Sequence, residues 1–495
     1  MSNTPPAKKV GLIVYFIGFT AALAGLLFGL DIGVISGAQI YIQRDLNVSD
    51  QMIEWIVSAL LWGAVAGALA SGVLCNKLGR RRTIMGSGLL FACGSIFCAV
   101  APDAQMLIVA RFALGLAVGM ASFTAPLYLA EIAPQSVRGG MISMYQLMIT
   151  IGILVAFLSD TLFAGVAEKQ IPLPEWGAEA GHHDALYFGS FVLSLATGDG
   201  TWRLMLGMVA VPALIMFAGV FFLPESPRWL LLNGLRQQAE SVFRKLHLDD
   251  AEIAAEVRAI EDSVKIPQKG WSLFFENAAF RRAVFLGIGL QICQQLTGIN
   301  VIMYYAPRIF GMAGFESTSE QLWGTVIVGL TNVLATFIAI AFVDRLGRKP
   351  IMYAGFVVMG LALLAVGGLF HSGVEGNPTL GYAAAFALLL FIVGFAMSAG
   401  PIIWVLCSEI YPLAGRDFGI TCSTGTNWIA NAIVGMTFLT LVQGLGPGNT
   451  FLLYGAMNVL FIIFFLFFVP ETKGVSLEQI EKNLMSGKRL REIGR

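Results

Sequence analysis

The sequence predicts an all-α membrane protein, with twelve transmembrane helices arranged as two pseudo-symmetric six-helix halves. Three observations predict this class: the composition, the spacing of the apolar runs and a set of short motifs that occur twice. Of the 495 residues, 57% are apolar and only 13% are charged, and the mean hydropathy is +0.75. Soluble domains carry roughly a quarter charged residues. About twelve apolar runs, each near the ~20 residues that a spanning helix needs, alternate with short charged segments.

The first apolar run, taken as a helix over residues 11–38, is expected to be retained in the mature protein. The preceding segment MSNTPPAKKV is mildly basic, and no small-residue cleavage site follows the run. Basic residues collect on the cytoplasmic side of a membrane. They occur here in alternate connections, so one orientation fits every connection and places both termini in the cytoplasm. The connections expected in the cytoplasm contain residues 76–82, 131–140, 224–229, 344–349, 408–416 and 470–474.

Three of these cytoplasmic motifs recur about half a chain apart. Gly79-Arg80-Arg81 is repeated as Gly347-Arg348-Lys349, and Pro224-Glu225-Ser226 is repeated as Pro470-Glu471-Thr472. Glu131 with Arg138 is likewise repeated as Glu409 with Arg416. Duplicated six-helix halves are a common transporter architecture. The predicted division is an amino-terminal half (1–224), a cytoplasmic linker of short helices (225–282), a carboxy-terminal half (283–474) and a cytoplasmic tail (475–495).

The connection over about 164–200 is a long outer segment to which we assign no role. Its apolar patch at 186–196 is too short to span a membrane. A membrane helix at this position would also move the basic segment 224–229 to the outer side, against the charge bias.

The duplicated cytoplasmic charges suggest a latch that closes and opens as one half rocks against the other. Carboxylates would pair with arginines of neighbouring loops in one state and release them in another. The alternative is that these charges only set topology, but acidic residues contribute little to topology. The predicted latch residues are Glu131, Arg138, Glu225, Arg228, Asp344, Arg348, Glu409, Arg416 and Glu471.

The segment QICQQLTGINVIMYY (291–305) carries several amides inside an apolar run. On an ideal helix its three glutamines fall within about 100° of one another, whereas Asn300 and Tyr304 lie on nearly the opposite face. Both groups can face one cavity only if the helix breaks. We therefore predict a break near Gly298, with Pro307 ending the segment, because broken helices line binding sites in transporters.

Further amides and indoles lie deep in other apolar runs. They are Gln146, Asn332, Asn427, Trp404 and Trp428. Amides both donate and accept hydrogen bonds, as a sugar's hydroxyls do, and an indole packs against the C–H face of a sugar ring. An uncharged polyol is therefore the favoured ligand. The alternative for any single amide is an interhelical hydrogen bond.

Asp31 lies in the outward half of the first apolar run, with no basic residue beside it. An acid inside the membrane costs about 2.5–3.5 kcal/mol and marks a functional site by default. Arg111, which we expect at the start of the fourth helix, lies at a similar depth. A carboxylate that pairs with arginine in one state and takes up a proton in another is a proton-coupling device. The alternative is a structural salt bridge.

The segments PESPR, PETKG, QQLTGIN and GPIIWVLCSEIYP, together with the two GRR/GRK loops, resemble the sugar porter family of the major facilitator superfamily. The resemblance covers nearly the whole chain. It implies the major facilitator fold and a transporter that carries a hexose inward with a proton. One departure is Asn76, where the family usually has aspartate, so the amino-terminal latch is expected to be weaker than the one at Asp344.

The resemblance also implies roles for individual residues. It places Asp31 and Arg111 in proton coupling and makes Tyr304 and Tyr305 an outer gate. The residues implied to line the sugar site are Gln146, Gln294, Gln295, Asn300, Asn332, Trp404 and Asn427, with apolar walls from Phe28, Ile149, Ile153, Phe395 and Trp428.

The sequence thus predicts a monosaccharide importer for galactose or glucose in a bacterial inner membrane, working as a monomer among lipids. The proton is the coupling ion, and no cofactor or metal is expected because the six cysteines and four histidines are scattered. The formal net charge of zero gives no indication of nucleic-acid binding. A sugar uniporter and, less favoured, a non-transporting sugar sensor are the alternatives; an enzyme is not expected.

Overall fold

The computed structural model describes residues 12–133, 135–168, 198–246, 250–264, 270–374 and 376–494. All regular structure within these residues is helical. Twelve helical segments among them are long and apolar enough to cross a membrane, which confirms the predicted class.

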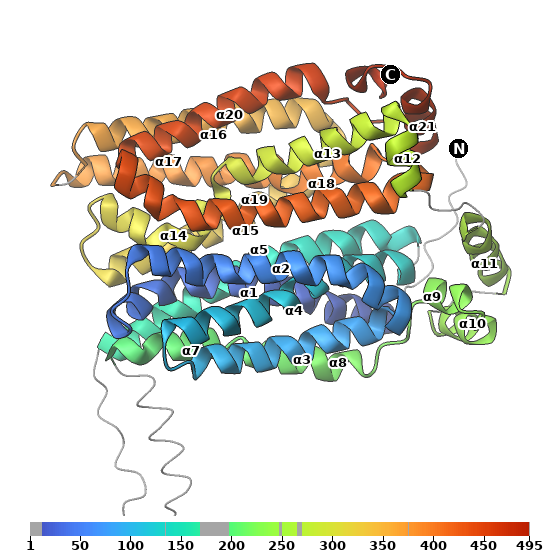
Figure 1. Ribbon diagram of the computed structural model, residues 1–495, viewed down its shortest axis with the longest axis horizontal. Coiled ribbons are helices and arrows are strands. Elements are labelled where there is room, and N and C mark those ends of the chain that lie inside the picture. The colour runs from blue at the N-terminus through green and yellow to red at the C-terminus, as the bar shows by residue number, and fades with distance from the viewer. Residues whose placement is uncertain are drawn as a thin grey trace, which may run out of the picture.

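The amino-terminal helices form the lower layer in Figure 1. Polar residues begin two of them, because the Ser49 side chain accepts from the N–H of Met52 and the Asp103 side chain accepts from the N–H of Met106. The elements are α1 (Leu12–Asp45), α2 (Asp50–Leu78), α3 (Arg80–Ala99), α4 (Ala104–Ile132), α5 (Gln135–Glu168), η1 (Gly198–Thr201), α7 (Trp202–Gly207) and α8 (Ala210–Val220).

Short helices follow at one end of the bundle (Figure 1). They are α9 (Pro227–Leu232), α10 (Arg236–Lys245), α11 (Asp250–Val264) and α12 (Gly270–Glu276). The next long helix begins at Ala278, inside the segment expected as linker.

The carboxy-terminal helices form the upper layer in Figure 1, with α21 at the same end as the linker helices. The elements are α13 (Ala278–Leu296), α14 (Ile299–Met312), α15 (Thr318–Leu346), α16 (Arg348–His371), α17 (Pro378–Met397), α18 (Ala399–Glu409), η2 (Leu413–Gly415), α19 (Arg416–Leu445), α20 (Pro447–Phe468), α21 (Leu477–Met485) and η3 (Leu490–Glu492).

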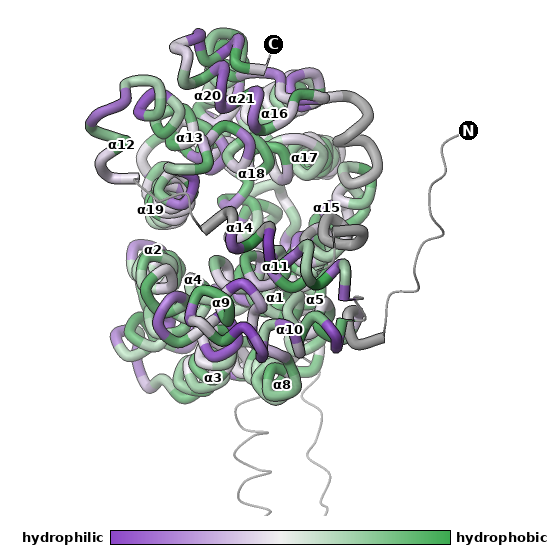
Figure 2. Tube along the Cα trace, turned by 90° about the vertical axis from the view of Figure 1, so that its right-hand side faces the viewer, coloured by the Kyte–Doolittle hydropathy of each residue, from purple (hydrophilic) through white to green (hydrophobic). Residues whose placement is uncertain are grey.

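The two layers meet through a few long helices: α2 packs on α19, α5 on α15, and α1 on α14. Viewed along the bundle in Figure 2, the helices form two groups, with hydrophobic residues along the helices and hydrophilic ones gathered at the connections. The polar groups of any central site must therefore come from these interfacial helices.

Close packing of α1 on α5 depends on glycine. A Cβ on Gly29 would lie 2.0 Å from the carbonyl oxygen of Ile149, and a Cβ on Gly33 would lie 2.3 Å from the Ala156 methyl. Small residues let two helix backbones approach in this way. This close contact, called the α1–α5 seam below, holds the predicted site residues Ile149 and Ile153 of α5 against α1.

Three local expectations are wrong. Arg111 does not begin the fourth helix, because α4 begins at Ala104 with Asp103 as its cap. Pro307 does not end α14, which continues to Met312. The proline ring removes one N–H donor, and the chain accommodates it with non-helical dihedral angles at Tyr305 inside this helix. Residues 164–168 of the predicted outer segment belong to α5, and residues 169–197 lie outside the described part.

Candidate functional site

The predicted break in the seventh membrane segment is confirmed. Helix α13 ends at Leu296 and α14 begins at Ile299, with Gly298 between them at φ 96°. Only glycine adopts this left-handed conformation without strain. The break brings the two polar faces together, because the Asn300 amide of α14 donates to the Gln295 side-chain oxygen of α13.

A second amide cluster lies between α13 and α19. The Asn427 amide donates to the side-chain oxygens of Gln291 (2.7 Å) and Gln294 (2.8 Å). The Gln294 amide in turn donates to the carbonyl oxygens of Ala399 (2.8 Å) and Gly400 (3.1 Å), where α18 begins. These bonds orient Gln294 fully, since its N–H groups are fixed at α18 and its oxygen faces Asn427.

The apolar residues predicted for the site lie in three places. Phe28 of α1 and Trp428 of α19 lie with their ring centroids 5.3 Å apart, so they meet across the two layers. Ile149 and Ile153 are buried on the α1–α5 seam. Phe395 is half-buried near the end of α17.

Three predicted polar residues have side chains without a hydrogen bond to any described residue. Gln146 of α5 is half-buried, Asn332 of α15 is 7% exposed, and Trp404 of α18 is 38% exposed. Their polar atoms are therefore not engaged by the described part of the chain, unlike the Asn427 amide.

Asp31 and Arg111 are each 1% exposed, in the interior of α1 and α4. Arg111 Nε donates to the carbonyl oxygen of Ile56 at 2.7 Å. Neither Asp31 oxygen has a hydrogen-bond partner among the described residues, and neither does Nη1 of Arg111. The predicted partners are thus buried in neighbouring helices without forming an ion pair in this conformation.

The predicted gate tyrosines lie in α14, beyond the helix break, where they are buried and hydrogen-bonded. The Tyr304 hydroxyl donates to the Asn431 side-chain oxygen at 3.1 Å, and its carbonyl accepts from Gln39 of α1 at 2.7 Å. The Tyr305 hydroxyl donates to the carbonyl of Gly435 at 2.7 Å. Both tyrosines therefore bind α14 to α19, and Tyr304 also binds it to α1.

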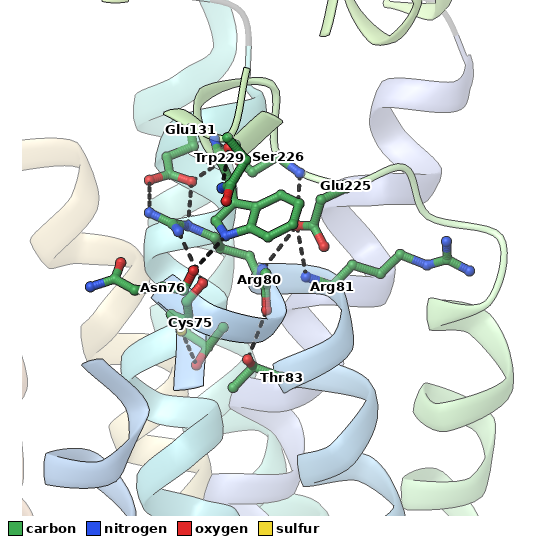
Figure 3. Close-up of polar contacts among 12 residues, drawn as sticks. Cys75, Asn76, Arg80, Arg81, Thr83, Glu131, Glu225, Ser226 and Trp229 are labelled. Carbon is green, nitrogen blue, oxygen red and sulfur yellow. Dashed lines mark hydrogen bonds and ion pairs between the residues drawn. The ribbon is translucent and has the colours of Figure 1, made fainter. Parts of the chain in front are cut away.

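Figure 3 shows the amino-terminal cluster of predicted latch residues. Arg80 binds Glu131 through two nitrogens, Nε and Nη2, each at 2.8 Å, and the Ser226 hydroxyl donates to the same carboxylate at 2.5 Å. Glu225 accepts from the backbone N–H groups of Arg80 (2.8 Å) and Arg81 (3.1 Å). These N–H groups open α3, so Glu225 also stabilises the positive end of that helix dipole.

The carboxy-terminal cluster repeats this arrangement. Arg348 Nη2 lies 3.1 Å from Glu409, and the Thr472 hydroxyl donates to Glu409 at 2.5 Å. Glu471 accepts from the backbone N–H groups of Arg348 (3.1 Å), Lys349 (2.9 Å) and Lys473 (3.0 Å). Partial burial opposes ionisation of Glu471, but these donors and the Arg348 charge hold its pKa below its usual value of 4.5.

The remaining latch predictions have mixed outcomes. The side chains of Arg138 and Asp344 lie outside the described part of the structure. Arg228 is exposed and makes no ion pair with a described residue, whereas Arg416 donates to the carbonyl of Tyr411 at 3.4 Å. Among the described residues, the polar contacts of each cluster stay within its own half.

Sequence reasoning missed several polar residues of the interior. Asp160 of α5 is 1% exposed and accepts from the N–H of Gly37 at 3.1 Å. It carries the same signal as Asp31, a lone acid in an apolar run. The central latch arginine Arg80 and the amide of Gln291 were visible within recognised motifs but were not assigned a role.

Comparison with known proteins agrees with this architecture. Residues 17–484 match the family model described as sugar (and other) transporter, and the chain belongs to this family. It is therefore a transporter and not an enzyme, as predicted.

Individual relatives extend over the full chain. The galactose-proton symporter of Escherichia coli (strain K12) is 54% identical over 494 residues, 99% of each chain. The arabinose-proton symporter of the same strain is 47% identical over 481 residues, 97% of this chain and 95% of the relative. The inward open conformation of the xylose transporter XylE from E. coli superposes with a TM-score of 0.77 at 30% identity, covering 95% of this chain and 100% of that one.

Proposed function

We propose that this protein imports a monosaccharide, galactose or glucose, together with a proton, by alternating access between its two halves. The observation that carries the proposal is the broken seventh segment. The break brings Gln295 and Asn300 together, next to the cluster of Gln294 with Asn427. Neutral donors and acceptors held in fixed directions suit a neutral polyol.

The proposed sugar site includes the unpaired amides as well. Gln146, Asn332 and Trp404 present polar atoms that no described residue satisfies, and Phe28 with Trp428 supplies an aromatic wall from both layers. A sugar bound among them would contact both halves at once, which is the condition for coupling its binding to their movement. The strong similarity to a galactose-proton symporter favours galactose over a pentose.

Asp31 is the proposed proton carrier. It is a buried carboxylate with no hydrogen-bond partner in the described part of the chain, in a helix adjoining the one that carries Arg111. Ionised, it would be stabilised by approach of the guanidinium; protonated, it is stable without it. Movement of α1 relative to α4 would thus change its proton affinity.

Replacement of Asp31 by asparagine tests this role in proteoliposomes. Asp31→Asn should abolish sugar accumulation against a gradient and sugar-induced proton uptake, while leaving sugar exchange at equilibrium intact. Asp160→Asn is the matched control, since it removes another buried acid that contacts α1 at Gly37; it should still accumulate sugar. Accumulation by Asp31→Asn would refute the coupling role and favour a uniporter.

The proposal extends to topology and assembly. We place the protein in a bacterial inner membrane as a monomer among lipids, with both termini in the cytoplasm and with the division at 1–224, 225–282, 283–474 and 475–495. The clusters around Glu131 and Glu409 then lie at the cytoplasmic ends of the two halves and form the proposed latch.

A further inference from the structure

Two acidic residues lie one turn apart on the outer end of α2, at the end of the bundle opposite the linker helices. Asp50 accepts from Gln43 (2.9 Å) and Arg308 (2.6 Å) through one oxygen, and from Gln443 (2.8 Å) through the other. Arg308 Nη2 also donates to the Gln43 side-chain oxygen at 2.6 Å. Asp50 therefore joins α1 and α2 of one layer to α14 and α19 of the other.

The second acid, Glu54, makes a contact of the same kind. Its carboxylate accepts from the Thr440 backbone N–H at 2.9 Å and from the Thr440 hydroxyl at 2.6 Å. Glu54 is buried, with 2% of its surface exposed. On α19, Thr440 and Gln443 are three residues apart and share a face, so α2 and α19 meet along a line of charge-assisted hydrogen bonds.

An open cavity of about 450 Å³ lies over these contacts. Its lining includes Arg44, Asp50, Arg308, Leu439 and Gln443. Asp50, Arg308 and Gln443 bond across the layers, so these bonds hold together two sides of the cavity lining.

We propose that Asp50 and Glu54 form a lock, with Arg308, Thr440 and Gln443, that holds the outer ends of the two halves together. Its bonds cross between the halves, whereas the ion pairs of Arg80 with Glu131 and of Arg348 with Glu409 each join residues of one half. They must therefore break whenever the site opens outward. The lock sets how often this opening occurs, and its assignment to the outer side rests on the proposed function.

The expected change in the outward-open population depends on how far solvent reaches the bonds of the lock. The pair of Arg308 and Asp50 is partly exposed, at 16% and 30% of their side-chain surfaces, so solvent screens it. The Glu54 side chain that accepts the other bonds is buried, so solvent weakens these bonds less. Removing either set should raise the outward-open population about three- to tenfold.

A reporter cysteine in place of Leu439, which is a buried residue of the cavity lining, measures this population directly. A membrane-impermeant maleimide is applied to right-side-out vesicles, and labelling of protein with only the native cysteines is subtracted. The lock variants are Arg308→Gln and Thr440→Val, each combined with Leu439→Cys. Thr440→Val removes one hydroxyl at nearly constant volume, so the fold should be retained.

Matched controls come from the same helices. Thr437→Val removes a hydroxyl that donates only to carbonyl oxygens of α19, and Arg44→Gln removes a charge from the same cavity without breaking an ion pair to a described residue. We expect faster labelling, by about three- to tenfold, in both lock variants and no change in the controls.

Equal labelling of Thr440→Val and Thr437→Val would overturn the lock, as would equal labelling of Arg308→Gln and Arg44→Gln. The assay needs neither sugar nor a proton gradient. If the lock variants are labelled faster but the unsubstituted protein does not transport sugar, the lock stands and the proposed function is refuted.

Discussion

Truncation of two buried asparagines of the proposed sugar site should change the stability of the protein by clearly different amounts. Asn427 and Asn332 are 6% and 7% exposed, so truncation to alanine removes a similar amount of buried amide. They differ in their bonds: Asn427 donates to Gln291 and Gln294, whereas the Asn332 side chain has no hydrogen-bond partner among the described residues. The pair thus separates structural from ligand-binding amides.

The magnitude for Asn427→Ala follows from the acceptors it leaves behind. Each buried oxygen without a donor costs about 1–3 kcal/mol. Gln294 cannot turn its own amide toward the gap without losing its bonds to Ala399 and Gly400. The Gln291 amide donates only a weaker bond, to the Cys407 sulfur at 3.5 Å, so this side chain can reorient. The expected loss is therefore about 2–4 kcal/mol for Asn427→Ala, and much less for Asn332→Ala.

Thermal unfolding in detergent, with and without sugar, is the assay. Without sugar, Asn427→Ala should unfold at a clearly lower temperature than the parent, and Asn332→Ala should unfold near the parent. At one high galactose concentration the parent should be stabilised more than either variant, because stabilisation by a bound ligand rises with the logarithm of its concentration divided by Kd. Equal unfolding temperatures of the two sugar-free variants would refute the structural role assigned to the Asn427 side chain.

Two further predictions concern packing and pH. Gly29→Ala should destabilise the protein strongly, because the added Cβ would lie 2.0 Å from the Ile149 carbonyl oxygen. Gly72→Ala is the control: no atom lies within 4 Å of its added Cβ, so it should stabilise α2 by about 0.5–1 kcal/mol. The two unfolding temperatures are compared, and equal values would contradict the close packing of α1 on α5. Glu471 has a lowered pKa, so the stability that its carboxylate contributes is complete above its ordinary value of 4.5 and is lost as pH falls through the lowered native value. Glu471→Gln should therefore be less stable than the parent near neutral pH, and the difference should shrink as the pH falls through the lowered native pKa, measured by unfolding at a series of pH values; a constant difference would contradict this.

The membrane segments were predictable because a bilayer imposes a length and a composition on each of them. Their ends were less predictable, since helix termini depend on local capping. Asp103 starts α4 seven residues before Arg111 only because its carboxylate accepts the N–H of Met106. Pro307 was expected to end a helix, but a proline in a membrane helix is tolerated where neighbouring packing compensates for the lost bond.

The candidate site was predictable to the level of residue type and helix face. The break at Gly298 followed from two polar faces that one straight helix could not turn to a single cavity. The partners did not follow, because the bond from Asn427 to Gln294 joins positions 133 residues apart in the sequence. The outer contacts of Asp50 and Glu54 gave no signal either, since an acid near a helix end is ordinary in isolation.

The mutual pairing of the amides bears on how tightly a sugar can bind. A ligand hydroxyl that inserts between Asn427 and Gln294 gains bonds to both but replaces a bond that already exists, so only the difference contributes to affinity. The unpaired atoms of Gln146 and Asn332 offer hydroxyls a gain without that loss. Because these two residues lie on α5 and α15, which pack together across the two halves, the net affinity for sugar depends on how the halves are placed. A site built this way binds moderately and changes affinity as it opens, which is what a transporter needs in order to release its substrate.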